Sequence, residues 1–316
     1  MIPDANESSH LPVLVVEVVA MLVTNPDGAY LDLTAGAGGH MKALASKLGK
    51  AARLYGLDRD PLAVVRTKRN LGDCRQVRDV VHAAYGDLKT VVGQFEDKKF
   101  DGILLDLGLS SDQLADAERG FSFSLEGPLD MRFDPESGGP TAAELLNSLS
   151  KKDLTAIFRD FGEEKQAARI AAAIVRERQQ RMFTASADLT TIVSQLAPPN
   201  YRTKALARCF QALRIAVNDE LAQLSKLLPI ALDFLNTGGR MAVIAYHSLE
   251  DRIVKRFFQQ AAKGCTCPPR FPVCVCGRVP QMQIITRKPI MPAAEEIASN
   301  PRSRSARLRV AERLPV

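Results

Sequence analysis

The segment Tyr30–His40, with the sequence YLDLTAGAGGH, carries most of the information about the fold. A short apolar stretch, Tyr30–Leu33, runs into a turn with three glycines, and a helical pattern follows. Glycine is needed where the backbone takes a positive φ or where a ligand approaches the main chain closely. A second apolar stretch ends on Asp58, eighteen residues beyond His40, where an acid can meet the hydroxyls of a nucleotide ribose. These features predict a cofactor that contains adenosine at the carboxyl end of the first strand.

The glycine spacing separates two classes of cofactor. A nicotinamide dinucleotide site has the pattern G-x-G-x-x-G, in which the third glycine lets helix and strand pack closely. Counted from Gly36, this chain has Gly38 in the second position but Met41 in the third. Asp32, before the turn, is unfavourable beside a pyrophosphate and favourable beside a cationic amine. S-adenosyl-L-methionine has an amine, a ribose and an adenine but no phosphate, so it is the predicted cofactor. A glycine-rich turn that binds nothing is the alternative.

The composition is that of an ordinary globular protein. The chain has 316 residues, of which 46% are hydrophobic and 25% charged, and this length allows one large domain or two of usual size. No apolar run is long enough to cross a membrane, and the N-terminus lacks the basic cluster of a signal peptide. Six cysteines do not make a disulfide framework in such a chain, so we expect a location in the reducing cytoplasm.

The order of predicted elements indicates a doubly wound parallel sheet in the first third of the chain. Apolar strands alternate with helical patterns, and these strands lie at Tyr30–Leu33, Arg53–Leu57, Val80–Ala83 and Gly102–Leu105. A loop rich in Gly, Pro, Phe and Asp follows, and then helices with capping boxes such as Thr141–Glu144. We interpret the block from about residue 114 to residue 202 as a helical insertion in the sheet domain.

The sheet pattern resumes after the insertion. A single long helix is predicted over Lys204–Leu235, followed by a buried strand at Arg240–Tyr246. Two final segments, Gln281–Thr286 and Ala306–Ala311, are expected to close the sheet as an antiparallel pair. The predicted division is therefore a sheet domain over residues 1–113, an inserted helical substrate-recognition domain over 114–203, and the rest of the sheet domain with a basic C-terminal segment over 204–316.

The positive charge of the chain is concentrated near its C-terminus. The net charge is +6, yet residues 263–316 alone contain ten basic and three acidic residues. Five arginines fall within Arg302–Arg313, where alternating apolar residues predict a strand that keeps the arginines on one face. Such a cluster commonly marks contact with nucleic-acid phosphates. A solvated basic tail is the alternative.

Segments spread over nearly the whole chain resemble one family, the bacterial ribosomal RNA small subunit methyltransferase H family. The similar segments are Asp32–His40, Leu57–Pro61 (LDRDP), Asp101–Ser111 (DGILLDLGLSS), Glu118–Arg132 (ERGFSFSLEGPLDMR), Gln211–Glu220 (QALRIAVNDE), His247–Phe258 (HSLEDRIVKRFF) and Asn300–Arg309 (NPRSRSARLR). The occurrence of all these segments together, in this order, is specific for the family. The resemblance implies an α/β class I S-adenosylmethionine-dependent methyltransferase, a Rossmann-like doubly wound sheet with an inserted helical domain. It also implies N4-methylation of a cytidine in the decoding region of 16S rRNA.

The resemblance further implies particular site residues. The implied cofactor contacts are Gly38, Gly39, His40, Asp58, Tyr85, Asp106 and Gln113, to which the glycine-turn argument adds Asp32 and Gly36. For the rRNA phosphates, the expected contacts are Arg302, Arg304 and Arg307. The chain also departs from the family pattern, because Tyr85 and Tyr246 stand where Phe is usual, and Leu206–Cys209 replaces a His-Pro-Ala-Thr-Arg-Thr run.

Asp106 and His247 are the candidate catalytic residues. Asp106 ends a predicted central strand, at the edge where α/β sheets bind ligands, and it could accept a hydrogen bond from a substrate amino group or from the cofactor. His247 follows another strand and could orient the cytosine or a phosphate, or relay a proton. Alternatively, His247 only closes the turn before a helix whose capping box is Ser248 with Asp251.

Two further pairs of residues have competing interpretations. Phe121 and Phe123 lie in the glycine-rich loop and are either stacking partners for the base or ordinary core aromatics. Asp130 and Arg132 are expected to form a structural ion pair rather than to face the substrate.

Four cysteines lie within twelve residues, and they are Cys265, Cys267, Cys274 and Cys276. Four thiols can surround a zinc ion tetrahedrally, but C-x-C pairs are less usual in zinc sites than C-x-x-C pairs. Reduced thiols are therefore favoured over a structural zinc, and no metal is assigned to the candidate active site.

The leading hypothesis is an enzyme that methylates 16S rRNA in the small ribosomal subunit, without contact with a membrane. The alternative is a non-catalytic RNA-binding protein that retains a methyltransferase fold. The sequence leaves the oligomeric state open, with a homodimer among the options.

Overall fold

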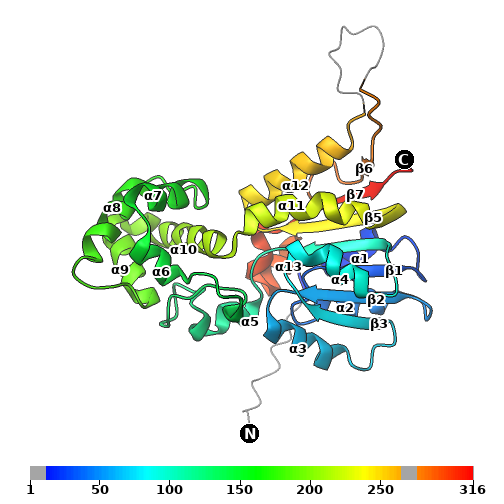
Figure 1. Cartoon of the computed structure of the whole chain (residues 1–316), viewed down its shortest axis with the longest axis horizontal. Coiled ribbons are helices and arrows are strands. Elements are labelled where there is room, and N and C mark those ends of the chain that lie inside the picture. The colour runs from blue at the N-terminus through cyan, green and yellow to red at the C-terminus, as the bar shows by residue number, and fades with distance from the viewer. Residues whose placement is uncertain (1–11, 265–275, 316) are drawn as a thin grey trace. The chain divides into compact units, whose positions relative to one another are not determined.

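The computed structural model describes residues 12–264 and 276–315. The chain divides into two compact units. The first, which we call the sheet unit, comprises Met1–Gly108 and Gln223–Val316, and the second, the helical unit, comprises Leu109–Ala222. The helical unit, green in Figure 1, is thus inserted into the chain of the sheet unit and extends beyond the expected range of 114–203 at both ends.

The sheet unit is built on a seven-stranded sheet, counted over the described residues. The strands are β1 (Ala29–Asp32), β2 (Arg53–Asp58), β3 (Val77–His82), β4 (Phe100–Asp106), β5 (Leu235–Ala245), β6 (Met282–Ile284) and β7 (Arg307–Arg313). Their order is β3-β2-β1-β4-β5-β7-β6. Strands β1 to β5 are parallel, and β7 runs antiparallel between β5 and β6. The predicted Rossmann-like class I methyltransferase fold is confirmed, and the predicted C-terminal strand pair closes its sheet.

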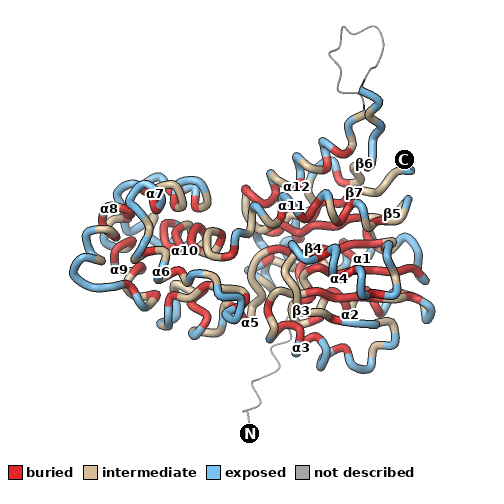
Figure 2. The backbone as a smooth tube through the Cα atoms, in the orientation of Figure 1, coloured by how far each residue is buried: buried red, intermediate tan, exposed pale blue. Residues whose placement is uncertain are grey.

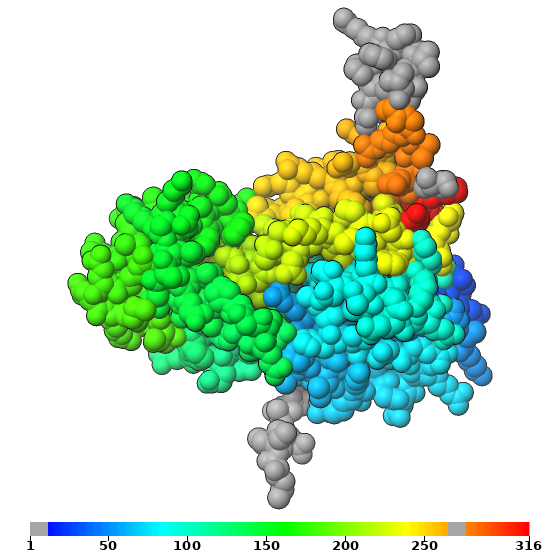
Figure 3. Space-filling model, viewed as in Figure 1, coloured from blue at the N-terminus to red at the C-terminus, as the bar shows by residue number. Residues whose placement is uncertain are grey.

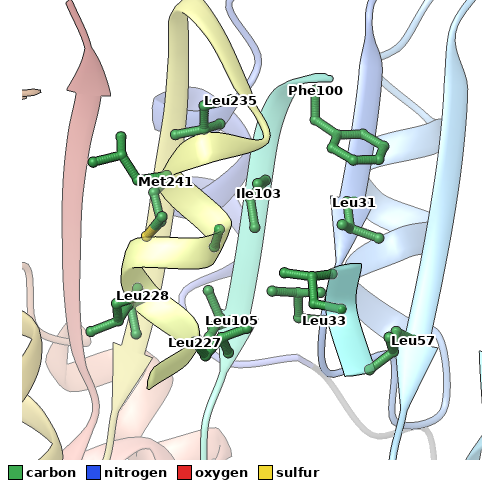
Figure 4. Close-up of a cluster of buried hydrophobic side chains, with 14 of the residues drawn as sticks. Leu31, Leu33, Leu57, Phe100, Ile103, Leu105, Leu227, Leu228, Leu235 and Met241 are labelled. Atoms are coloured by element: carbon green, nitrogen blue, oxygen red, sulfur yellow. The ribbon is translucent and has the colours of Figure 1, made fainter. Parts of the chain in front are cut away.

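Helices cover both faces of this sheet. One face carries α1 (Val15–Leu22), α2 (Gly39–Ala45) and α3 (Pro61–Leu71), and the other carries α4 (Leu88–Gln94), α11 (Glu220–Asp233) and α12 (Ser248–Ala261); α13 (Ala294–Ser299) precedes β7. A hydrophobic core lies on each face: the first under α1, α2 and α3, and the second under α4, α11 and α12. Because successive strand residues point to opposite faces, Tyr30 belongs to the first core and Leu31 to the second. Figure 4 shows the second core, where Leu227 of α11 lies beside Leu105 of β4, and Figure 2 shows that the central strands are buried.

The helical unit has a hydrophobic core of its own. Its helices are α5 (Ser111–Ala115), α6 (Ala142–Ser148), α7 (Lys151–Asp160), α8 (Ala167–Glu177), α9 (Ser186–Leu196) and α10 (Arg202–Asn218). Apolar side chains from these helices and from the loops between them form one cluster, which includes the buried Phe158 of α7 and Phe183, which lies between α8 and α9. Thr141 and Ser150 cap α6 and α7, as their sequence patterns predict. Figure 3 shows this unit, in green, as a continuous body.

Two local predictions are wrong. The single helix expected over Lys204–Leu235 is two helices, because Asp219 takes a left-handed conformation with φ 50° that ends α10. The capping box of α12 is shifted by one residue, since His247 rather than Ser248 accepts the hydrogen bond from the backbone N–H of Glu250.

Within the described ranges, no helix combines the length and the apolar composition that crossing a membrane requires.

A substitution at Gly102, in β4, can test how closely the sheet unit is packed. A Cβ at this position would lie 2.6 Å from the ring of Tyr30 and 2.9 Å from the side chain of Leu22. Overpacking of a close-packed core costs about 1–3 kcal/mol. Gly102→Ala is therefore expected to lower the free energy of unfolding by about that amount, as measured by chemical denaturation.

Gly93→Ala is the matched control. Gly93 lies in α4, and no atom lies within 4 Å of an added Cβ. This variant should gain up to about 1 kcal/mol, because alanine favours the helical backbone more than glycine does. Equal denaturation midpoints for the two variants would contradict the packing described.

Candidate active site

Four side chains meet at the carboxyl edge of the sheet because their strands are parallel neighbours. Asp32 ends β1, Asp58 ends β2, Asp106 ends β4, and Tyr246 directly follows β5. Open α/β sheets bind their ligands at this edge. The register therefore brings three of the predicted site acids together, as the sequence analysis expects.

The turn after β1 presents its backbone to the same edge. Gly36 and Gly38 have φ angles of 56° and 85°, which favour glycine. A Cβ at Gly38 would lie 3.1 Å from Leu71, so this glycine serves the packing of α3. At Gly36 the nearest atom to an added Cβ is a backbone oxygen 3.8 Å away. The space beside Gly36 is thus open to a ligand, whereas Gly39 begins α2 and packs against the ring of Pro12.

Asp58 ties this turn to β2. Its carboxylate accepts hydrogen bonds from the backbone N–H groups of Gly36 and Asp60, both at 2.8 Å. Burial raises the pKa of Asp58 to about 6 despite these hydrogen bonds. Each carboxylate oxygen has two lone pairs, so Asp58 keeps the capacity to accept hydrogen bonds from ligand hydroxyls.

Asp32 is a fully buried carboxylate with one oxygen left without a partner. Its Oδ1 accepts a hydrogen bond from the backbone N–H of Thr34 at 2.9 Å, whereas its Oδ2 has no hydrogen-bond partner among the described residues. Burial raises the pKa of Asp32 to about 6, although the nearby His40 opposes the rise. A buried charge is costly unless it is paired. This oxygen keeps the capacity to accept a hydrogen bond from a donor group on a ligand.

His40, in the first turn of α2, is the neighbour of two acids. Its Nε2 lies 3.3 Å from Oδ2 of Asp106, in a contact that falls short of hydrogen-bond geometry. Its Nδ1 has no partner in the described part of the chain. Burial acts to lower the pKa of His40, but the carboxylates of Asp106 and Asp32 outweigh burial and raise it. The two acids thus favour the protonated imidazole.

Asp106 is held from three sides. Its backbone N–H donates to Oγ1 of Thr34 at 2.6 Å, the hydroxyl of Tyr246 donates to its Oδ1 at 2.9 Å, and His40 faces its Oδ2. The side chain remains 24% exposed. Thr34 also donates its hydroxyl to Oδ1 of Asp32 at 3.2 Å, so one side chain joins two of the acids.

Tyr85 and Gln113 occupy different units. Tyr85 begins a 3₁₀ turn after β3 and packs, partly buried, against the core of the sheet unit. The backbone N–H of Ala83 donates to the carbonyl of Asp58, which brings this stretch to the site edge. Gln113 lies in the helical unit, where its Oε1 accepts a hydrogen bond from the backbone N–H of Ser110 and caps α5. The sheet unit therefore groups Tyr85, but not Gln113, with the site acids.

His247 caps α12. Its Nδ1 accepts from the backbone N–H of Glu250 at 3.4 Å, and its Nε2 lies 3.1 Å from Oε1 of Glu250. Glu250 is 2% exposed and accepts a hydrogen bond from the backbone N–H of Tyr246 at 2.8 Å. This geometry favours the interpretation in which His247 closes the turn.

The C-terminal arginines differ in how far they are exposed. Arg302 and Arg304 are exposed on the 3₁₀ turn that precedes β7. Arg307 is 41% exposed and lies 3.5 Å from Asp251 of α12. Arg309 is buried and forms a 2.6 Å ion pair with Asp251. Arg309 therefore joins β7 to α12 and is not available for a phosphate, unlike the first two arginines.

The loop residues of the helical unit have structural roles. Asp130 and Arg132 form the predicted ion pair, with 2.6 Å between Oδ2 and Nη2. Phe121 is buried, and its ring centroid lies 5.6 Å from that of Phe133 within the helical core. Phe123 packs partly buried against the same core. The core interpretation of both aromatics is favoured.

The cysteine cluster falls largely outside the described residues, where Cys265, Cys267 and Cys274 lie. Cys276 is described and exposed. Among residues 12–264 and 276–315, no three His, Cys, Asp or Glu side chains are grouped in a way that could hold a metal ion.

The contacts of Thr34 and Tyr246 with the site acids were not predicted from the sequence. Each lies within two residues of the end of a predicted strand at the site edge, and this position was the available signal. Their hydroxyls matter because each donates to a carboxylate at this edge, Thr34 to the fully buried Asp32 and Tyr246 to the partly exposed Asp106.

The residues at this edge fit S-adenosyl-L-methionine. Its ammonium group matches the unpartnered oxygen of Asp32, and its ribose hydroxyls match the acceptor capacity of Asp58. The open space beside Gly36 lets a ligand approach the backbone. A pyrophosphate would instead meet the buried carboxylate of Asp32, which argues against a nicotinamide dinucleotide.

Comparison with known proteins identifies the family. The chain matches the MraW methylase family over residues 7–314. It is 47% identical over 312 residues to ribosomal RNA small subunit methyltransferase H of Heliobacterium mobile, which covers 98% of this chain and 100% of that protein. It is 46% identical over 314 residues to the protein of the same name from Trichlorobacter lovleyi, with 98% and 99% covered.

Among solved structures, an rRNA methylase from Streptococcus thermophilus aligns with a TM-score of 0.39 and 12% identity over 100% of this chain and 99% of that one. This similarity is too distant to add to the assignment, which rests on the sequence matches. The chain belongs to the MraW methylase family, and it is an S-adenosyl-L-methionine-dependent methyltransferase.

Proposed function

We propose that this methyltransferase transfers a methyl group from S-adenosyl-L-methionine to N4 of a cytidine in the decoding region of 16S rRNA, within small subunits in the cytoplasm. The proposal rests mainly on the position of the Asp106 carboxylate, which is partly exposed at the carboxyl edge of the sheet and is contacted by His40 and Tyr246. The relatives are named as ribosomal RNA small subunit methyltransferases, which supports the class of substrate.

The chemistry needs alignment and charge stabilisation. N4 of cytosine is a poor nucleophile because its lone pair is delocalised into the ring. S-adenosyl-L-methionine supplies a methyl group that its sulfonium has already activated. The protein must therefore hold the nitrogen in line with the methyl carbon and accept hydrogen bonds from the amino group as positive charge develops on it. Asp106 performs the second task with the lone pairs that His40 and Tyr246 do not use.

The remaining acids bind the cofactor. Asp32 pairs with its ammonium group, and Asp58 accepts hydrogen bonds from its ribose hydroxyls, with the backbone of residues 36–40 lining the approach. Tyr85 is proposed as a packing partner of the adenine, and Gln113 as a further contact. His247 serves the site by capping α12 rather than by touching the substrate.

Arg302, Arg304 and Arg307 are proposed to bind rRNA phosphates. Because β7 is antiparallel to β5, its first residue, Arg307, lies opposite Ala245 at the carboxyl edge of the sheet. The exposed arginines before it therefore enter from the edge that carries Asp106. Phosphate contacts of this kind fix the position of a nucleic acid without reading its sequence. The helical unit, residues 109–222, is proposed as the second rRNA-binding element.

Methyl transfer from labelled S-adenosyl-L-methionine to small subunits that lack the modification tests the proposed function. Digestion of the RNA to nucleosides should place the label in N4-methylcytidine. Asp106→Ala is expected to lower the rate about a hundredfold or more, because a preorganised group that stabilises developing charge contributes about that much.

Asp73→Ala, which removes an exposed carboxylate of the sheet unit, is the matched control and should keep the full rate. Cofactor binding without label in any nucleoside would contradict the proposal and favour the non-catalytic RNA-binding alternative.

The raised pKa values of Asp32 and Asp58, both about 6, predict that cofactor affinity depends on pH. Below pH 6 these carboxyls hold protons that must leave before they can pair with an ammonium group or accept from hydroxyls. The Kd measured by calorimetry should therefore rise by about tenfold for each pH unit lost per carboxyl. Asp32→Asn should weaken binding at pH 7 by about tenfold to a hundredfold and flatten the pH dependence.

Asp73→Asn should leave both the affinity and its pH dependence unchanged. Without cofactor, the stability of the protein depends on pH in the opposite direction to the cofactor affinity, because the folded state keeps protons that the unfolded state has lost. Stability should then fall as the pH rises from about 4 through 6. An affinity that does not change between pH 5 and pH 7 would contradict the assignment of Asp32.

Arg302→Ala combined with Arg304→Ala tests the phosphate contacts. Loss of two phosphate contacts to single-stranded RNA should reduce the slope of log affinity against log salt by about 1.4. The Kd for S-adenosyl-L-methionine should not change. Arg287→Ala with Lys288→Ala removes the same charge from two exposed positions and is the control. If both pairs weaken binding of the small subunit equally, the arginines act through net charge alone.

A further inference from the structure

The hydroxyl of Tyr246 makes a direct contact with the candidate catalytic acid. It donates to Oδ1 of Asp106 at 2.9 Å, across 140 positions of the sequence. Tyr246 follows β5 and Asp106 ends β4, and these strands are neighbours in the sheet. The contact therefore follows from the strand order, at the edge where ligands bind.

The protein fixes the tyrosine ring in this place. The backbone N–H of Tyr246 donates to the buried carboxylate of Glu250 at 2.8 Å. On one side the ring lies against Gly108, whose φ is 94°, and a Cβ there would come within 3.4 Å of the ring. Burial and the neighbouring Asp106 raise the pKa of the Tyr246 hydroxyl well above its ordinary value. The hydroxyl therefore stays protonated, and its proton is donated to the acid.

The other contacts of Asp106 fix its backbone or lie outside hydrogen-bond geometry. Its backbone is fixed through Thr34, but this contact does not set the rotation of the carboxylate. His40 faces Oδ2 at 3.3 Å without hydrogen-bond geometry. Among the hydrogen bonds of the described residues, the one from Tyr246 is therefore the contact that orients the carboxylate plane.

We propose that Tyr246, which stands where Phe is usual in the family, is a positioning residue for methyl transfer in this chain, and that its hydroxyl orients the Asp106 carboxylate so that a free lone pair faces the amino group of the substrate. The inference rests on the proposed function. An amino group that gains positive charge binds an oriented carboxylate more strongly in the transition state than in the ground state. Orientation therefore affects kcat more than KM.

Tyr246→Phe tests the inference because it removes only the hydroxyl. The kcat for methyl transfer to small subunits should fall about tenfold, which corresponds to 1.4 kcal/mol. The KM values for S-adenosyl-L-methionine and for the subunits should change by less than about twofold. An unchanged kcat in an active preparation would overturn the inference.

Tyr55→Phe is the matched control. The hydroxyl of Tyr55 also donates to a carboxylate, that of Asp97, at 2.9 Å, and Asp97 precedes β4. This variant loses the same kind of hydrogen bond away from the site. It should lower stability while leaving kcat unchanged, which separates positioning from a general loss of stability.

A double-mutant cycle with Asp106→Ala completes the test. If Tyr246 acts through Asp106, Tyr246→Phe should have no further effect on methyl transfer once the carboxylate is gone. A tenfold loss in both backgrounds would show that Tyr246 acts independently, and it would overturn the inference. A wild-type protein that labels no nucleoside would overturn the proposed function itself, so the two failures are distinguishable.

Discussion

The site depends on one physical constraint, a carboxylate that the fold removes from water without pairing it fully. Asp32 ends a central strand, is fully buried, and leaves one oxygen without a hydrogen-bond donor among the described residues. Burial of this kind raises the pKa of the group and makes its charge costly. A ligand with a cationic amine relieves that cost, whereas a phosphate increases it. We therefore propose that the desolvation of this one side chain selects the cofactor.

The parallel sheet places the residues proposed for methyl transfer beside this buried carboxylate. Because β2, β1, β4 and β5 are neighbours, Asp58, Asp32, Asp106 and Tyr246 share one edge. Thr34 joins two of these acids through its hydroxyl. The acid proposed to bind the cofactor amine, Asp32, and the acid proposed to face the substrate, Asp106, are thus parts of one connected network. Because β7 is antiparallel, it brings the basic C-terminal segment back to this edge.

The sequence predicts the parts of the molecule that local patterns control. The glycine turn, the strand-terminal acids and the closing strand pair follow from spacing and periodicity, and the structure places them as expected. The break of the long helix at Asp219 depends on a left-handed residue that helical periodicity does not reveal. The burial of Arg309 depends on Asp251 of α12, which packs above β7 from a distant part of the chain. The orienting role of Tyr246 likewise requires knowing that β4 and β5 are neighbours.

Calorimetry of S-adenosyl-L-methionine binding in buffers of different ionisation enthalpy measures the protons released on binding, and it therefore tests directly whether the buried Asp32 binds the cofactor. If Asp32 and Asp58 are each about half protonated near pH 6 and must ionise to bind the ligand, binding should release about half a proton from each carboxyl at that pH. Near pH 8 the sign should reverse, because the amine of the ligand then takes up a proton. Asp32→Asn should remove about half of the release at pH 6 and leave the share of Asp58. A binding enthalpy independent of the buffer at pH 6 would contradict the account.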